Sequence, residues 1–289
     1  MTKINDIDDF NKITSSITSF SHAYLFNTNS LNHMYFYAKE FAKKIICEEI
    51  NDEIKENVIY QIDNDEYDDL YIINPDTISI KTEEIEKLFQ VMATKSLIKN
   101  GRRVYIICGI ERLSKEVSNK ILKFLEEPVD NLYGILLTEN IDHILSTIVS
   151  RCQVLNISFD VDNIDNDIVN IMISFLVKIK RIGPATIAYI NDFFENIYGD
   201  RIRMYDAFQV LEKVFSNHIE KRYQKDYEKK YAIEEYDEIS INSIINMLEI
   251  TNKFKMLIKK NINLNLLIDR YIIELSKELE YAKDSRNNI

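Results

Sequence analysis

Short apolar runs punctuate the first half of the chain. Most of them are apolar at successive positions, which is typical of strands buried on both faces of a parallel sheet. The pattern therefore predicts a sheet of five strands. Their ranges are His22–Phe26, Asp69–Asn74, Arg103–Cys108, Tyr133–Thr138 and Gln153–Ser158.

Helical patterns lie between these runs. Residues Leu31–Glu49 place apolar side chains at helical spacing. A second pattern, Thr82–Lys95, opens with a threonine suited to an N-cap and two glutamates, and a third, Ser114–Glu127, ends before Pro128. Strands that alternate with helices indicate crossover connections, so we expect a parallel sheet flanked by helices.

After Ser158 the strand-like runs give way to long helical patterns. These cover Asn166–Ile182, Met204–Lys230 and Leu264–Ala282, and the pair Gly183–Pro184 fits a turn between two helices. The fold class expected is α/β plus all-α. We expect an α/β domain over residues 1–158 and an all-α domain over residues 159–289, joined by a short acidic link.

Composition and charge narrow the function classes. The chain has 5 glycines, 3 prolines and 46% hydrophobic residues, as expected for helices with short connections. No apolar run reaches a membrane-spanning length and no signal segment opens the chain, so a cytoplasmic location is expected. The net charge is −11, and the stretch Glu48–Asp76 holds eleven acids and one base. We expect this stretch to be a solvated, flexible acidic segment, and the charge balance disfavours tight, independent binding to DNA.

Several segments together resemble a known family, the delta-prime subunits of the bacterial DNA polymerase III clamp loader, which belong to the AAA+ superfamily. The resemblance is specific over about Ser21–Ser158 and weaker at the C-terminal end. Its most specific part is "LKFLEEP" followed about twenty residues later by "TIVSRCQ". The matching segments are "SHAYLF" (Ser21–Phe26), "INPD" (Ile73–Asp76), "SNKILKFLEEP" (Ser118–Pro128), "STIVSRCQ" (Ser146–Gln153) and "NINLNLLID" (Asn261–Asp269).

The resemblance implies a function in DNA replication. Clamp loaders are five-protein arcs that open the ring-shaped sliding clamp and place it on primed DNA. Their motor (gamma/tau) subunits hydrolyse ATP at the junctions between neighbours, while delta-prime serves as a rigid, non-catalytic jaw or stator. The partners implied are the motor subunits and the delta subunit, and through them the clamp and primer–template DNA, with no membrane.

The phosphate-binding loop of this superfamily is degenerate here. Aligned on the first strand, the pattern G-x-x-x-x-G-K-[ST] falls on Thr28, His33, Met34 and Tyr35, so the glycines and lysine that cradle phosphates are replaced. At the Walker B positions, Cys108 and Gly109 replace the acidic pair that handles magnesium and water, and Glu111 lies two residues too far along. We expect no bound nucleotide and no other cofactor.

Arg151 is retained within "SRC", Ser150–Cys152. The resemblance implies that it is an arginine finger directed in trans at the ATP of a neighbouring subunit, with Ser150 and Cys152 shaping the turn. A guanidinium suits this role because it stays charged and can form a fork of hydrogen bonds to a γ-phosphate. The alternative is a structural arginine bonded to carbonyls at a helix end. At Thr138–Asn140, where the family has a polar sensor residue, we expect a structural cap.

Two departures from the family pattern lead to further expectations. Relatives carry a four-cysteine zinc module, of which only Cys47 is present, so we expect no zinc. Residues 159–289 are enough for a helical collar but not for a collar and a lid, so we expect a lid that is missing or reduced to a linker around residues 159–166. Two other functions stay open: a weak P-loop NTPase with an unusual loop, and an AAA+-like scaffold outside the replisome.

Overall fold

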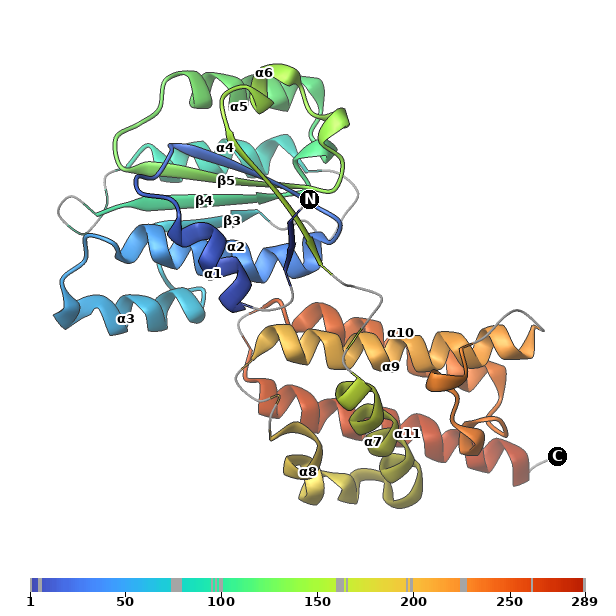
Figure 1. The fold of residues 1–289 in the computed structure, drawn as a ribbon. Coiled ribbons are helices and arrows are strands. Elements are labelled where there is room, and N and C mark those ends of the chain that lie inside the picture. Colours follow the sequence, from blue (N-terminus) through green and yellow to red (C-terminus); the bar gives the residue numbers. More distant parts are fainter. Residues whose placement is uncertain are drawn as a thin grey trace. The chain divides into compact units, whose positions relative to one another are not determined.

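The computed structural model describes most of the chain, which divides into two compact units, Met1–Val161 and Asp162–Ile289 (Figure 1). The described residues are 2–4, 7–73, 80–94, 96, 98, 101–159, 164, 166–195, 197, 200–223, 228–260 and 262–287, the last five without their side chains. The first unit is α/β and the second is all-α, which confirms the predicted fold class.

The first unit is built on a parallel six-stranded sheet in the order β1-β6-β2-β5-β4-β3. All five predicted strands are confirmed, with ends that differ by at most two residues. The sixth strand, β1, was not predicted, since its three residues are too few to show a period. The strands are β1 (Thr2–Ile4), β2 (Ala23–Thr28), β3 (Leu70–Ile73), β4 (Arg103–Cys108), β5 (Leu132–Thr138) and β6 (Gln153–Phe159).

Helices cover both faces of this sheet (Figure 1). Ala23 and Leu25 of β2 join an aliphatic core under α4, α5 and α6, while Tyr24 and Phe26 face an aromatic core with Phe41 of α2. Both faces are therefore buried, which explains why β2 is apolar at successive positions. The elements of this unit outside the sheet are α1 (Ile7–Ser15), α2 (Leu31–Cys47), α3 (Asp52–Asp63), α4 (Thr82–Met92), η1 (Ile110–Arg112), α5 (Lys115–Glu126), η2 (Ile141–His143) and α6 (Ser146–Val149).

The ends of the predicted helices follow local capping chemistry. Ser114 caps α5, because its hydroxyl accepts a hydrogen bond from the Val117 N–H at 3.3 Å. The prediction that Thr82 is the N-cap of α4 was wrong. Lys81 holds that position, and its backbone N–H donates to Glu84 Oε2 at 2.9 Å. The carboxylate at the third helical position thus does the capping.

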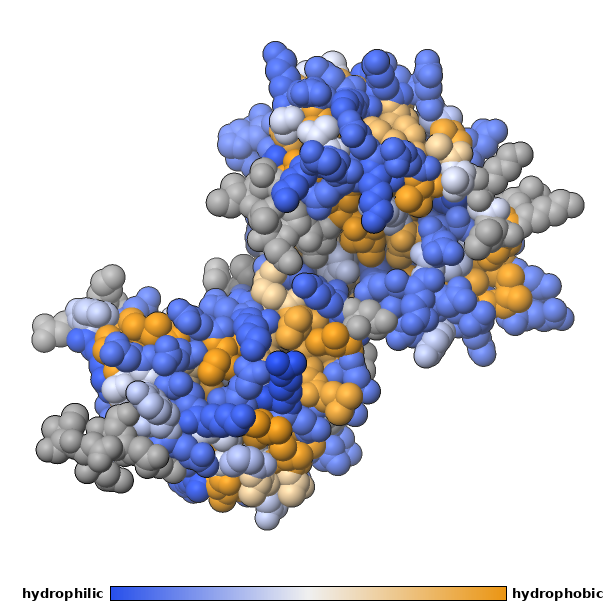
Figure 2. Space-filling view, turned by 180° about the vertical axis from the view of Figure 1, so that it is seen from behind, coloured by the Kyte–Doolittle hydropathy of each residue, from blue (hydrophilic) through white to orange (hydrophobic). Residues whose placement is uncertain are grey.

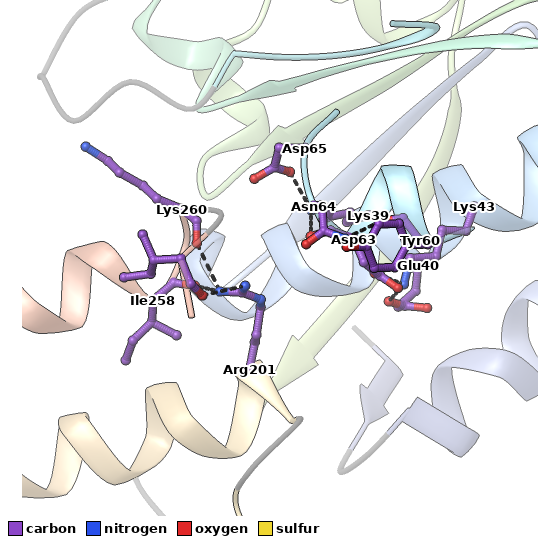
Figure 3. Close-up of polar contacts among 11 residues, drawn as sticks. Lys39, Glu40, Lys43, Tyr60, Asp63, Asn64, Asp65, Arg201, Ile258 and Lys260 are labelled. Carbon is purple, nitrogen blue, oxygen red and sulfur yellow. Dashed lines mark hydrogen bonds and ion pairs between the residues drawn. The ribbon is translucent and has the colours of Figure 1, made fainter. Parts of the chain in front are cut away.

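The acidic stretch contains a helix, α3, that the sequence pattern did not predict. Its apolar side packs through Val58 and Ile62, both buried, whereas its acids lie on the exposed side. Two lysines of α2 hold its end: Lys39 pairs with Asp65 and Lys43 with Asp63, each at 2.5 Å (Figure 3). These ion pairs attach the end of α3 to α2, and the stretch is helical over Asp52–Asp63 instead of a flexible segment throughout. The segment 74–76 of "INPD" lies outside the described residues.

The second unit is a helical domain with one core. The ring of Tyr271 on α11 contacts Phe175 of α7, Phe208 of α9 and Phe254 of α10, at centroid distances of 6.5, 4.8 and 5.4 Å. Its hydroxyl pairs with Thr251 Oγ1 at 2.9 Å, so the polar group is satisfied. The elements are α7 (Asn166–Ile182), η3 (Gly183–Tyr189), α8 (Ile190–Phe194), α9 (Arg201–Arg222), η4 (Lys229–Tyr231), η5 (Glu234–Tyr236), α10 (Ile241–Leu257) and α11 (Leu264–Asn287).

Arg201, the first residue of α9, holds the connection between α10 and α11. Its guanidinium donates to the carbonyls of Ile258 at 2.7 Å and Lys260 at 3.0 Å (Figure 3). It also donates to the carbonyl of Ile262 at 3.2 Å. A cation is favourable beside Ile258, the C-cap of α10, because the last carbonyls of a helix have no partner within the helix and carry partial negative charge.

Polar residues cover most of the face of the molecule drawn in Figure 2. Apolar residues form smaller patches among them. Among the described helices, none is both long enough and apolar enough to cross a membrane.

Candidate functional site

The edge where the parallel strands end is the place to look for a site. β2 lies in the interior of the sheet between β5 and β6, and open α/β sheets bind ligands beyond the carboxyl ends of such strands. At this edge the topology gathers the loop after β2, Gly109 after β4, the end of β5 at Thr138 and the end of β6 at Phe159. The structure thus brings together the predicted phosphate-loop and Walker B positions.

The residues at the phosphate-loop positions are largely buried. Thr28 ends β2 and is fully buried, and α2 begins three residues later at Leu31. Met34, at the position of the P-loop lysine, is 0% exposed, and Tyr35 is 5% exposed. The side chain at position 34 therefore belongs to the core of the unit.

The backbone amides at the start of α2 already have partners within the chain. The Leu31 N–H donates to Glu139 Oε1 at 2.9 Å, and the His33 N–H to Ser30 Oγ at 3.4 Å. The Ser30 N–H donates in turn to Thr28 Oγ1 at 3.2 Å. In a nucleotide-binding loop such amides point at phosphates, because the first N–H groups of a helix are unpaired and carry partial positive charge. Here a carboxylate and two hydroxyls of the chain itself occupy them.

Neither of the two Walker B positions carries a carboxylate, and the second has an unusual backbone conformation. Cys108 is buried at the end of β4, and Gly109 adopts the left-handed conformation with φ +74°, which strains any residue with a side chain. Glu111 accepts a hydrogen bond from Thr138 Oγ1 at 2.7 Å. Thr138 also accepts from the Asn140 N–H at 3.0 Å, which closes a threonine turn two residues long; the N-cap of η2 is Asn140, which makes no side-chain cap bond. In the described part of the chain, no group of three His, Cys, Asp or Glu side chains is placed to hold a metal ion.

Arg151 lies at the opposite edge of the sheet, just before the amino end of β6. Its guanidinium donates to the Thr147 carbonyl at 2.9 Å and to Glu126 Oε1 at 2.7 Å, and its side chain is 34% exposed. The bond to Thr147, in α6, is the contact that the structural alternative predicts. The partnership with Glu126 was not predicted from the sequence, although both residues lie in segments that carry the family resemblance.

Ser150 and Cys152 flank Arg151 on either side. Ser150 Oγ donates to the Thr147 carbonyl at 3.1 Å. Burial raises the pKa of the Cys152 thiol to about 12, so it stays protonated at neutral pH and is a poor nucleophile. Burial also raises the pKa of Cys47, at the end of α2.

Comparisons with known proteins point to one family. The family model described as "DNA polymerase III, delta subunit" matches residues 6–160, more than half of the 289 residues. DNA polymerase III subunit delta' of Bacillus subtilis is 34% identical over 137 residues, which cover 47% of this chain and 41% of that protein. Its counterpart in Haemophilus influenzae is 36% identical over 93 residues, which cover 32% and 28%. The matches thus span less than half the length of these relatives.

Among solved structures, a DNA polymerase III gamma subunit-related protein from Thermotoga maritima aligns over 95% of this chain and 100% of its own. The TM-score is 0.41 and the sequence identity 13%, so this likeness supports no conclusion about function.

Proposed function

The chain belongs to the DNA polymerase III delta subunit family, and from this premise we propose that it is a delta-prime-type subunit of a clamp loader. In this role it assembles with motor (gamma/tau) subunits and a delta subunit and helps to load a sliding clamp onto primed DNA. It hydrolyses no ATP itself and supplies Arg151 to the ATP site of a neighbouring motor subunit. The subunit role rests on the sequence resemblance. The lack of ATP hydrolysis is inferred from the carboxyl edge of the sheet, and the action of Arg151 in trans from its place at the opposite edge.

The observation that carries the proposal is the occupied start of α2. A phosphate would have to displace Glu139 from the Leu31 N–H, and it would find neither a lysine nor an acidic Walker B pair to hold magnesium. The carboxylate would also repel the phosphate charge. We therefore expect no heat of binding when MgATP is titrated into the purified protein. Micromolar affinity in this titration would contradict the non-catalytic role.

Arg151 suits action in trans because its ion pair with Glu126 is weak. An ion pair at the surface contributes about 0–1 kcal/mol, since water and salt screen the charges. The pair with Glu126 is of this kind, with 34% and 47% of the two side chains exposed. A γ-phosphate carries more negative charge than one carboxylate, so a neighbour's ATP can replace Glu126 as the partner of the guanidinium.

Arginine variants in a reconstituted clamp loader test this role. With Arg151→Ala we expect the complex to assemble but its ATPase rate to fall at least tenfold, because a finger stabilises charge that develops in the transition state. Glu126→Gln is the matched control: it removes the partner of Arg151 in the free chain but keeps the finger. The finger role predicts an ATPase rate that Glu126→Gln does not lower. A purely structural Arg151 predicts either an unchanged ATPase rate for Arg151→Ala or a loss that follows from failure of the complex to assemble.

We further propose that the second unit serves as the collar without a separate lid. In support, α7 shares the core of α9 and α11 through the contact of Phe175 with Tyr271. A lid that closes over ATP has no task in a subunit that binds none. The proposed linker lies partly outside the described residues, at positions 160–163 and 165.

A further inference from the structure

The loop after β2 is bonded to the end of β6. Asn29 Nδ2 donates to the Phe159 carbonyl, and the Phe159 N–H donates back to Asn29 Oδ1, both at 2.8 Å. The last backbone partners of the two strands are Thr28 and Ile157. The side-chain amide of Asn29 therefore extends the β2–β6 pairing beyond the last backbone pair.

Phe159 is held by rings from α2 as well. The His33 ring stacks on it with a centroid distance of 5.3 Å and an interplanar angle of 29°, and the Tyr37 ring lies at 5.1 Å. His33 Nδ1 also pairs with Ser30 Oγ at 2.8 Å. The loop thus reaches Phe159 through Asn29 and, independently, through His33.

On its other side the same loop is bonded to the end of β5. Glu139, the residue after β5, accepts from the Leu31 N–H at 2.9 Å. Its charge lies at the end of α2 where the helix dipole favours an anion. Ser30 and His33 connect this contact to the one with Phe159, because both belong to the turn with which α2 begins.

We propose that Thr28–His33 forms a ligand-independent clamp within the chain, unrelated to the ring-shaped sliding clamp. In it, Glu139 holds the first turn of α2, and Asn29 with His33 holds the last residue of β6. The clamp keeps the carboxyl ends of β5, β2 and β6 together where a nucleotide would otherwise contact them. Phe159 is also the last residue before the segment that leads to the second unit, so the clamp fixes the starting point of that segment. The inference rests on the proposed function in one respect, that no nucleotide occupies this loop.

Amide hydrogen exchange in the full chain, followed by NMR, tests the clamp. The Leu31 amide reports the Glu139 contact and the Phe159 amide reports the Asn29 contact. We expect Glu139→Gln to speed exchange at Leu31 about twofold to fivefold, through loss of the charge at the helix end. We expect Asn29→Ala to speed exchange at Phe159 at least about fivefold, through loss of the two neutral hydrogen bonds between these residues. Because the clamp acts as one unit, each variant should also speed exchange at the other amide.

Two control variants separate the clamp from general loosening. Glu83→Gln removes a charge from the first turn of α4, and Asn27→Ala removes the 2.8 Å bond between Asn27 and Asn156 in the same β2–β6 pair. Neither should change exchange at Leu31 or Phe159. If each clamp variant affects only its own amide, or if the controls have the same effect, the clamp is wrong.

Adding MgATP distinguishes failure of the clamp from failure of the proposed function. In the wild-type protein we expect MgATP to leave exchange at both amides unchanged. Protection that increases with MgATP would overturn both the clamp and the non-catalytic role. Uncoupled amides in a protein that does not respond to MgATP would overturn the clamp alone.

Discussion

Met34→Lys would place a lysine at the position where a P-loop carries one. If a missing side chain were the whole defect, this change would begin to restore an ATP site. The structure predicts the opposite, because Met34 is 0% exposed and lies within the core of the unit. The substitution should destabilise the protein and give no nucleotide binding.

The magnitude follows from the cost of burying an amine. A buried lysine without a carboxylate partner has its pKa lowered by up to three to five units, and each unit corresponds to 1.36 kcal/mol. Three units give about 4 kcal/mol at pH 7, a large part of the 5–15 kcal/mol by which domains are usually stable. Met34→Leu, which keeps the volume, should cost less than about 1.5 kcal/mol.

Urea unfolding of both variants measures these costs. Calorimetric titration with MgATP, at low temperature and without urea, measures binding. We expect a free energy of unfolding lower by about 4 kcal/mol for Met34→Lys, and no heat of binding. A Met34→Lys protein as stable as Met34→Leu would refute the buried placement of this side chain. Micromolar ATP binding by the variant would refute the account of the loop.

Three other predictions concern the second unit and the turn beside β6. Arg201→Ala should lower the free energy of unfolding by about 2 kcal/mol, because three carbonyls lose a charged donor, and urea unfolding checks this. Burial lowers the pKa of His218 from 6.5 despite the opposing charge of Asp237. Stability should therefore be complete above pH 6.5 and fall as the pH drops toward the lowered pKa. The free energy of unfolding, measured between about pH 5 and 8, should depend less on pH in His218→Gln. Cys152, with its pKa raised to about 12, should react with iodoacetamide at pH 8 far more slowly in the native protein than in urea, and equal rates would contradict its burial.

The sequence pattern predicts the buried elements of the fold better than the others. Three of the five strands that it predicts, β2, β4 and β5, are buried at nearly every position, so their apolar runs are unmistakable. It did not predict α3, where only Val58 and Ile62 are buried among many acids. It also did not predict α10, whose apolar residues are spread around the helix because it packs against both α9 and α11. Short or unevenly amphipathic elements depend on tertiary contacts that a local pattern does not contain.

At the site, the sequence identifies what is missing but not what replaces it. The degenerate positions Thr28, Met34 and Cys108 follow from a known spacing. Glu139 and Phe159, by contrast, contact the loop from 108 and 130 residues away along the chain. Such contacts are set by the order of strands in the sheet, so they become visible only once β5 and β6 are placed on either side of β2.

Clamp loading by a reconstituted complex tests the central claim most directly. Motor and delta subunits would be combined with the sliding clamp, primed DNA and ATP, with or without this chain, and the rate at which clamps reach DNA would be measured. The account predicts that loading depends on the chain, and that Arg151→Ala joins the complex without restoring the full rate. A loading rate that is the same with and without the chain would contradict it.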